Sequence, residues 1–84
     1  MSEIDWSRLR SLTARELIAA LIRDGFLLRH RTGNHRRFRD PDGRRVTVSF
    51  HHQGGTFRPK TLRSMIHDQA RWSDDDLRRL KIFK

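Results

Sequence analysis

Residues 26–50, FLLRHRTGNHRRFRDPDGRRVTVSF, contain three runs of strand-forming residues separated by two turn signals. Gly33 and Asn34 supply the first turn, and the four residues 40–43 (Asp-Pro-Asp-Gly) supply the second. We therefore expect strands over 26–32, 35–39 and 44–52. Because short links join consecutive strands, this stretch predicts an antiparallel meander.

Side-chain types alternate along the predicted strands. In 26–32 the alternation predicts a half-buried strand with one basic face. The short strand over 35–39 is centred on Phe38. In 44–52 apolar residues alternate with polar ones, and the apolar side consists of Val46, Val48 and Phe50. The sheet is therefore expected to bury one face and to expose the other.

A helix is predicted before the sheet, over residues 13–24. Thr13 and Glu16 have the spacing of a capping box, and Gly25 suits the left-handed conformation that commonly follows a helix. Leu12 and Leu17 occupy the positions of a hydrophobic staple. The apolar stripe of this helix consists of Leu17, Ile18, Leu21 and Ile22.

Two more helices are predicted after the sheet. Pro59 opens one that runs to about Gln69, and its buried side consists of Leu62, Met65 and Ile66. A capping signature over residues 73–76 starts a short C-terminal helix, whose apolar side consists of Leu77, Leu80 and Phe83. The fold class is α+β, in which an α-β-β-β-α order packs a three-stranded antiparallel sheet on two helices, with the short C-terminal helix appended. Residues 1–84 are expected to form a single small domain.

The positive charge is concentrated on the middle of the chain. The formal net charge is +9, and residues 26–67 alone carry +8 together with all five histidines. Arginine accounts for 16 of the 19 basic residues. The excess predicts a polyanionic partner, which is nucleic acid, an acidic protein or an anionic membrane surface. Because the guanidinium fork suits phosphate contacts and base stacking, nucleic-acid binding is favoured over a basic surface that is merely solvated.

Composition also excludes several classes of chemistry. The chain has no cysteine, which excludes disulfides, thiolate zinc sites and cysteine nucleophiles. No apolar run approaches the length of a membrane span, and the N-terminus lacks the apolar core of a signal peptide. We therefore expect a cytoplasmic protein with no membrane association.

In this order and spacing, the segments RELIAALIRDGF, LLRHR, GNH, VTVSFH and TLRSMI resemble the HicA-type toxins of type II toxin–antitoxin pairs. The resemblance covers about residues 13–70 and leaves 71–84 as a C-terminal helical extension. It implies a double-stranded-RNA-binding-domain-like fold. Two positions depart from the usual family pattern: Asn34 stands where the family commonly has serine, and Lys60 where it commonly has glycine.

The resemblance implies a metal-independent endoribonuclease that cleaves mRNA and is held inactive by a cognate HicB-type antitoxin. His35 matches the histidine that the family uses for RNA cleavage, and an imidazole can both accept and donate protons near neutral pH. His51 is the candidate second acid/base group or phosphate ligand. No cofactor is expected, because 84 residues leave no room for a separate cofactor domain. No metal is expected either, because there is no H-E-x-x-H motif and no carboxylate near the histidines in sequence.

Basic residues of the strands and of the second helix are the candidates for phosphate contacts that position RNA. These candidates are Arg29, Arg31, Arg36, Arg37, Arg39, Arg45, Lys60 and Arg63. Two alternatives stay open on the residues alone. The chain is a non-catalytic module that binds double-stranded RNA or another nucleic acid, or it is a basic adaptor that binds a protein.

Overall fold

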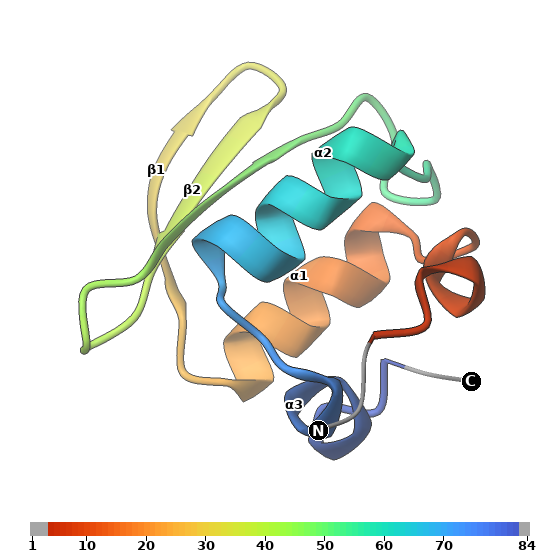
Figure 1. Ribbon diagram of the computed structural model, residues 1–84. Coiled ribbons are helices and arrows are strands. Elements are labelled where there is room, and N and C mark those ends of the chain that lie inside the picture. The colour runs from red at the N-terminus through yellow and green to blue at the C-terminus, as the bar shows by residue number, and fades with distance from the viewer. Residues whose placement is uncertain (1–3, 83–84) are drawn as a thin grey trace.

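The three strands form one antiparallel sheet with the order β1-β2-β3 in the computed structural model, which describes residues 4–82 (Figure 1). The strands are β1 (Leu27–Thr32), β2 (His35–Arg39) and β3 (Arg45–Ser49). His35 pairs with Thr32 on one side and with Ser49 on the other. The predicted fold class, α-β-β-β-α with a meander sheet, is confirmed.

The prediction of a half-buried first strand is wrong. All six residues of β1 are exposed, and the buried Phe26 lies just before the strand. The core lies beneath the other two strands, where Phe38, Val46 and Val48 are buried. A bulge between Leu28 and His30 also interrupts the alternation on which the prediction rested.

Helix α1 (Ala14–Arg23) begins and ends at its predicted signals. Thr13 is the N-cap, with both hydrogen bonds of the capping box to Glu16 present, and Gly25 has φ = 94°. Leu17 and Leu21 are buried as predicted. Ile22 is not part of the core: it is 58% exposed, because the alanines of the helix complete the buried stripe instead.

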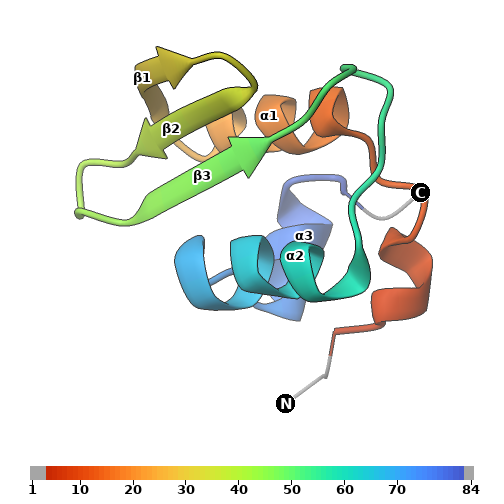
Figure 2. The same ribbon diagram turned by 90° about the horizontal axis from the view of Figure 1, so that it is seen from above.

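Helix α2 (Pro59–Arg63) continues without a break into the π-helical stretch η2 (Ser64–Gln69), so together they span the predicted helix. Its predicted buried residues, Leu62, Met65 and Ile66, are buried. The side-chain oxygen of Gln69 accepts the backbone N–H of Thr47 in β3 at 2.8 Å. The end of this helix therefore satisfies a backbone group on the free edge of β3 (Figure 2).

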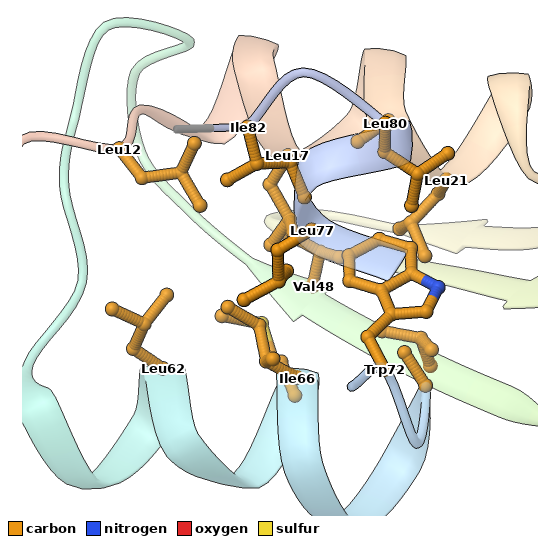
Figure 3. Packing of buried hydrophobic residues seen from close by; sticks show 14 of the residues in the cluster. Leu12, Leu17, Leu21, Val48, Leu62, Ile66, Trp72, Leu77, Leu80 and Ile82 are labelled. Carbon is orange, nitrogen blue, oxygen red and sulfur yellow. The ribbon is translucent and has the colours of Figure 1, made fainter. Parts of the chain in front are cut away.

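Segments from both ends of the chain add to the core. The 3₁₀ turn η1 (Trp6–Leu9), which the sequence analysis did not predict, buries Leu9. Helix α3 (Asp74–Arg79) begins at the predicted capping box of Ser73. The side chains of Leu77, Leu80 and Ile82 pack against α1 and α2 (Figure 3). The predicted apolar residue Phe83 lies outside the described residues.

Arg44, in the β2–β3 turn, connects that turn to the helices. Its guanidinium donates to Asp40 (Nε to Oδ2, 2.6 Å) and to Asp24 at the end of α1 (Nη2 to Oδ2, 3.1 Å). It also donates to the Ala70 carbonyl at 2.8 Å and lies 4.8 Å from the ring centroid of Phe26. One side chain thus contacts the strand–turn region, the end of α1 and the end of η2.

Asp24 receives two more donors. The indole N–H of Trp72 and the guanidinium of Arg79 each donate to it at 2.8 Å. Trp72 packs edge-on against Phe26 at 6.4 Å between ring centroids, and it is buried in the core. The residues that we call the Arg44 cluster are Asp24, Phe26, Asp40, Arg44, Ala70, Trp72 and Arg79.

The cluster lowers the pKa of both carboxyl groups. Burial alone raises the pKa of Asp40, but hydrogen bonds from the side chain and backbone of Arg44 outweigh it and bring that pKa below 3.8. Burial likewise raises the pKa of Asp24, and hydrogen bonds from Trp72 and Arg79 reverse the shift. Because these groups protonate more readily in the unfolded chain, their contribution to stability is complete above the ordinary pKa of 3.8 and is lost as the pH falls below it.

Replacing Arg44 by methionine (Arg44→Met) is expected to lower the free energy of unfolding by about 3 kcal/mol near neutral pH, because buried Asp40 loses its ion-pair partner and Asp24 keeps only Arg79. The difference from the wild type should narrow below about pH 4, where both carboxyls protonate in the unfolded chain. Urea denaturation near neutral pH and at about pH 3 measures both effects.

The matched control is Arg45→Met, which removes the neighbouring arginine from an exposed position on β3. Its stability should stay within about 0.5 kcal/mol of the wild type. Equal stability of the two variants would show that the Arg44 cluster does not hold the fold together.

Candidate active site and nucleic-acid interface

His35 is the first residue of β2, directly after the turn at Gly33 and Asn34. Gly33 has φ = 51°, a conformation that favours glycine. The imidazole is exposed, and its Nδ1 shares a hydrogen bond of 2.7 Å with the Oγ of Ser49, its cross-strand partner. This contact orients the ring and leaves Nε2 as the nitrogen that Ser49 does not engage.

The side chain of Asn34 brings His51 to the same turn. The side-chain Nδ2 lies 3.2 Å from the Nδ1 of His51, and the backbone carbonyl of Asn34 accepts the N–H of Phe50 at 3.0 Å. Both candidate acid/base histidines are therefore held through Nδ1 at one end of the sheet. The position where the family commonly has serine is here occupied by a side chain that contacts His51.

The pairing register sorts the predicted arginines by face. Directly paired residues lie on the same side of a sheet, so the face away from the helices, which we call the outer face, can be read from β2 and β3. The rows of the outer face are Thr32–His35–Ser49, His30–Arg37–Thr47 and Leu27–Arg39–Arg45. Three of the predicted RNA contacts therefore share a face with His35.

A shallow depression of about 430 Å³ lies on this part of the sheet. Its basic lining residues are Arg29, His30, Arg37, Arg39 and Arg45. Arg29, which precedes His30 at the bulge, thus joins the outer-face arginines at one concave site. This concentration of guanidinium groups beside His35 suits a phosphate chain.

Arg31 and Arg36 are paired with each other on the opposite face. Arg36 donates to the Gly33 carbonyl at 2.9 Å, and its guanidinium lies 5.2 Å from the ring centroid of Phe50. The structure therefore shows Arg36 bracing the β1–β2 turn. An RNA contact by either residue stays a prediction.

Lys60 and Arg63 belong to α2, in the helical layer beneath the sheet. The guanidinium of Arg63 lies 5.1 Å from the ring centroid of Trp6. Figures 1 and 2 show the start of α2 toward the same end of the molecule as the β1–β2 turn. Their contact with RNA also stays a prediction.

The other three histidines are not held at the β1–β2 turn as His35 and His51 are. The Nε2 of His30 shares a hydrogen bond of 2.6 Å with the hydroxyl of Thr32, and His67 of η2 contacts Asp68 at 3.0 Å. His52 is exposed in the loop after β3. Among residues 4–82, no three histidine or acidic side chains gather closely enough to hold a metal ion.

Sequence reasoning missed Ser49 as a partner of His35. In a regular hairpin the predicted turn at 40–43 pairs His35 with position 48, whereas the observed connection also includes Arg44 and moves the partner of His35 to Ser49. Arg44 was also missed, because an arginine in a basic stretch resembles its neighbours until its acidic partners are known.

The fold and the site define a small α+β protein whose sheet carries an exposed histidine beside a basic face. Residues 14–71 match the family model described as HicA toxin of bacterial toxin-antitoxin. The chain therefore belongs to the HicA toxin family and is a toxin of a toxin–antitoxin system, a role that implies a cognate antitoxin. No curated protein matches the chain. In the part of the chain that the structure describes, no helix has the length and apolarity to cross a membrane.

Substituting Ser49 by alanine is expected to change the ¹⁵N chemical shift of the His35 Nδ1, since the hydroxyl is the hydrogen-bond partner of that nitrogen. Long-range ¹H–¹⁵N NMR spectra of the two proteins measure this shift, with His67 as the internal control. If the His35 nitrogen shifts stay the same in both proteins, Ser49 does not orient the ring.

Proposed function

We propose that this toxin belongs to a type II pair and cleaves mRNA as a metal-independent endoribonuclease, with His35 as a general acid/base. The observation that carries the proposal is the exposed imidazole of His35, oriented by Ser49 at 2.7 Å and placed at the head of the basic outer face. A proton-transfer group and phosphate-binding cations thus occupy one surface.

The reaction needs no group from outside the chain and its RNA. The Nε2 of His35 removes the proton of a ribose 2′-OH, and O2′ then forms a bond to the adjacent phosphorus. The bond from phosphorus to O5′ breaks, which leaves a 2′,3′-cyclic phosphate and a 5′-hydroxyl. Arginines beside the site stabilise the negative charge that develops on the phosphorane-like transition state.

His51 is proposed as the acid that protonates the leaving O5′. The amide NH₂ of Asn34 can only donate, so the Nδ1 of His51, 3.2 Å away, accepts. This contact fits the neutral ring, whose proton sits on Nε2. The ring acts as an acid only when Nδ1 is protonated as well, and Nδ1–H then donates to the side-chain oxygen of Asn34 once the amide turns. In that protonated form His51 would give its Nε2 proton to the leaving O5′, the step opposite to that of His35.

The outer face supplies a track for the phosphate chain. Successive outward residues of a strand are about 6.6 Å apart, a spacing comparable to that of phosphates along an extended single strand. Arg37 and Arg39 follow His35 in this order along β2, and Arg45 pairs with Arg39. We therefore propose that RNA runs from His35 across the sheet toward the β2–β3 turn.

A HicB-type antitoxin is the proposed partner. Acidic groups of such a protein would meet the basic outer face and cover His35, because complementary charge guides association and sets register. An activity against mRNA would act in the cytoplasm. A second candidate function, nucleic-acid binding without cleavage, is favoured by the same outer face, whose arginines would contact phosphates without any help from His35.

His35→Ala is expected to reduce RNA cleavage by about 10²–10⁴-fold, the usual contribution of a general acid/base. Growth arrest on expression of the toxin alone should be lost in parallel. Cleavage of a labelled single-stranded RNA in EDTA by the purified protein measures the effect directly.

The matched control is His67→Ala, which removes an exposed imidazole from η2 and should leave cleavage unchanged. His35→Gln keeps a polar side chain and should bind RNA as the wild type does while failing to cleave it. If wild type and His35→Ala bind RNA equally and neither cleaves it, the chain is a binding module.

Replacing Arg37, Arg39 and Arg45 together by glutamine is expected to flatten the salt dependence of RNA affinity. Each lost phosphate contact removes about 0.7 from the slope of log affinity against log salt for a single strand, or about 2 for three contacts. Fluorescence anisotropy with a catalytically inactive His35→Gln background measures the slope. The double replacement of Lys60 and Arg63 is the comparison, and a larger effect there would move the RNA track to the helical layer.

A further inference from the structure

The two edges of the sheet differ. Along β3, the N–H of Thr47 is taken by the side chain of Gln69, and η2 lies against the strand. Along β1, no segment within residues 4–82 adds a further strand, and all six residues are exposed. Figure 1 shows β1 at the outer border of the sheet. A strand in this position presents backbone donors and acceptors that another extended chain can use.

Exposed apolar side chains are concentrated at this open edge. The large hydrophobic residues that are exposed within the described part of the chain are Ile22 (58%), Leu27 (62%) and Leu28 (49%). Leu27 pairs with Arg39 on the outer face, whereas Leu28 pairs with Phe38 on the helix side. Ile22 lies at the end of α1, just before the chain enters β1. The start of the open edge is therefore apolar on both of its faces.

The charges of β1 limit what can occupy the edge. Arg29, His30 and Arg31 follow the two leucines, so a second copy aligned on the same edge would bring arginines against arginines. The bulge between Leu28 and His30 adds a further obstacle to regular self-pairing. An acidic occupant meets the same bulge, but it avoids the charge repulsion and gains ion pairs instead.

A second depression in the surface also favours an acidic occupant of the edge. It measures about 250 Å³ and lies at the start of β1, where Leu27, Pro41, Arg29 and Arg39 line it together with Asp40. Asp40 is already bound by Arg44, which leaves two guanidinium groups to receive a carboxylate beside an apolar contact.

We infer that the open edge of β1 binds an extended segment of a partner protein, in which acidic and apolar residues alternate, as a fourth strand of the sheet. Backbone hydrogen bonds would supply the pairing, the apolar residues would cover Leu28 and Ile22 on the helix side, and the acidic residues would meet Arg29 and Arg39 on the outer face. The inference rests on the antitoxin partnership of the proposed function, and it assigns that partner a surface separate from the His35 turn.

The test uses the ¹⁵N-labelled protein and an acetylated, amidated peptide of four Glu-Val repeats, with the Lys-Val peptide as the comparison. The Glu-Val peptide is expected to shift the amide resonances of residues 27–32 in a saturable manner, and the Lys-Val peptide is not. Leu28→Glu and, separately, Ile22→Glu should each weaken binding by about fivefold or more, since each removes an apolar contact of about 1 kcal/mol and adds repulsion.

Thr61→Glu, which places the same charge on an exposed position of α2, is the matched control and should stay within twofold of the wild type. Shifts confined to the outer-face arginines, or equal binding by Leu28→Glu, Ile22→Glu and Thr61→Glu, would overturn the docking site. RNA cleavage by the same variants is a separate readout. If the wild type cleaves RNA but the Glu-Val peptide does not bind at the edge, only the docking site is refuted. If the peptide binds at the edge but the wild type does not cleave RNA, only the nuclease activity is refuted.

Discussion

The ion pairs of Arg44 with Asp24 and Asp40 are the constraint on which the rest of the structure depends. Asp40 and Arg44 stand on either side of the β2–β3 turn, Asp24 ends α1, and Ala70 follows η2. A single guanidinium donates hydrogen bonds to groups from all these elements. These bonds form together only when the turn lies at one position against the helices. A buried carboxylate without a cation destabilises the folded state. The Arg44 cluster therefore favours this packing over alternatives in which the carboxylates stay buried without a cation.

The two ends of the sheet consequently serve different purposes. At the β2–β3 end, the charge of Arg44 is neutralised by ion pairs within the fold. Arg44 therefore has a structural role, although it lies in the most basic part of the chain. At the β1–β2 end, hydrogen bonds from Asn34 and Ser49 hold two imidazoles at the surface. The remaining outer-face arginines lie between these ends, which is the arrangement that the proposed passage of RNA requires.

Features with local causes were predictable from the sequence. The capping boxes at Thr13 and Ser73 involve partners three residues away, and both form as predicted. The exposure of β1 was not predictable, because it depends on which strands the helices cover. The role of Arg44 depends likewise on Asp24 and Ala70, which are 20 and 26 residues away. For the candidate site, the turn signal at Gly33 and Asn34 placed His35 at a strand start, whereas its bond to Ser49 follows from a register that only the folded hairpin displays.

The central claim is that His35 and its neighbours cleave RNA by internal attack of the 2′-OH, and the chemical identity of the product ends tests it most directly. The purified toxin, acting in EDTA on a defined single-stranded RNA, should yield 5′ fragments that end in a 2′,3′-cyclic phosphate and 3′ fragments that begin with a 5′-hydroxyl. Mass spectrometry of the fragments distinguishes these ends. Fragments that carry a 5′-phosphate and a free 3′-hydroxyl would contradict the account.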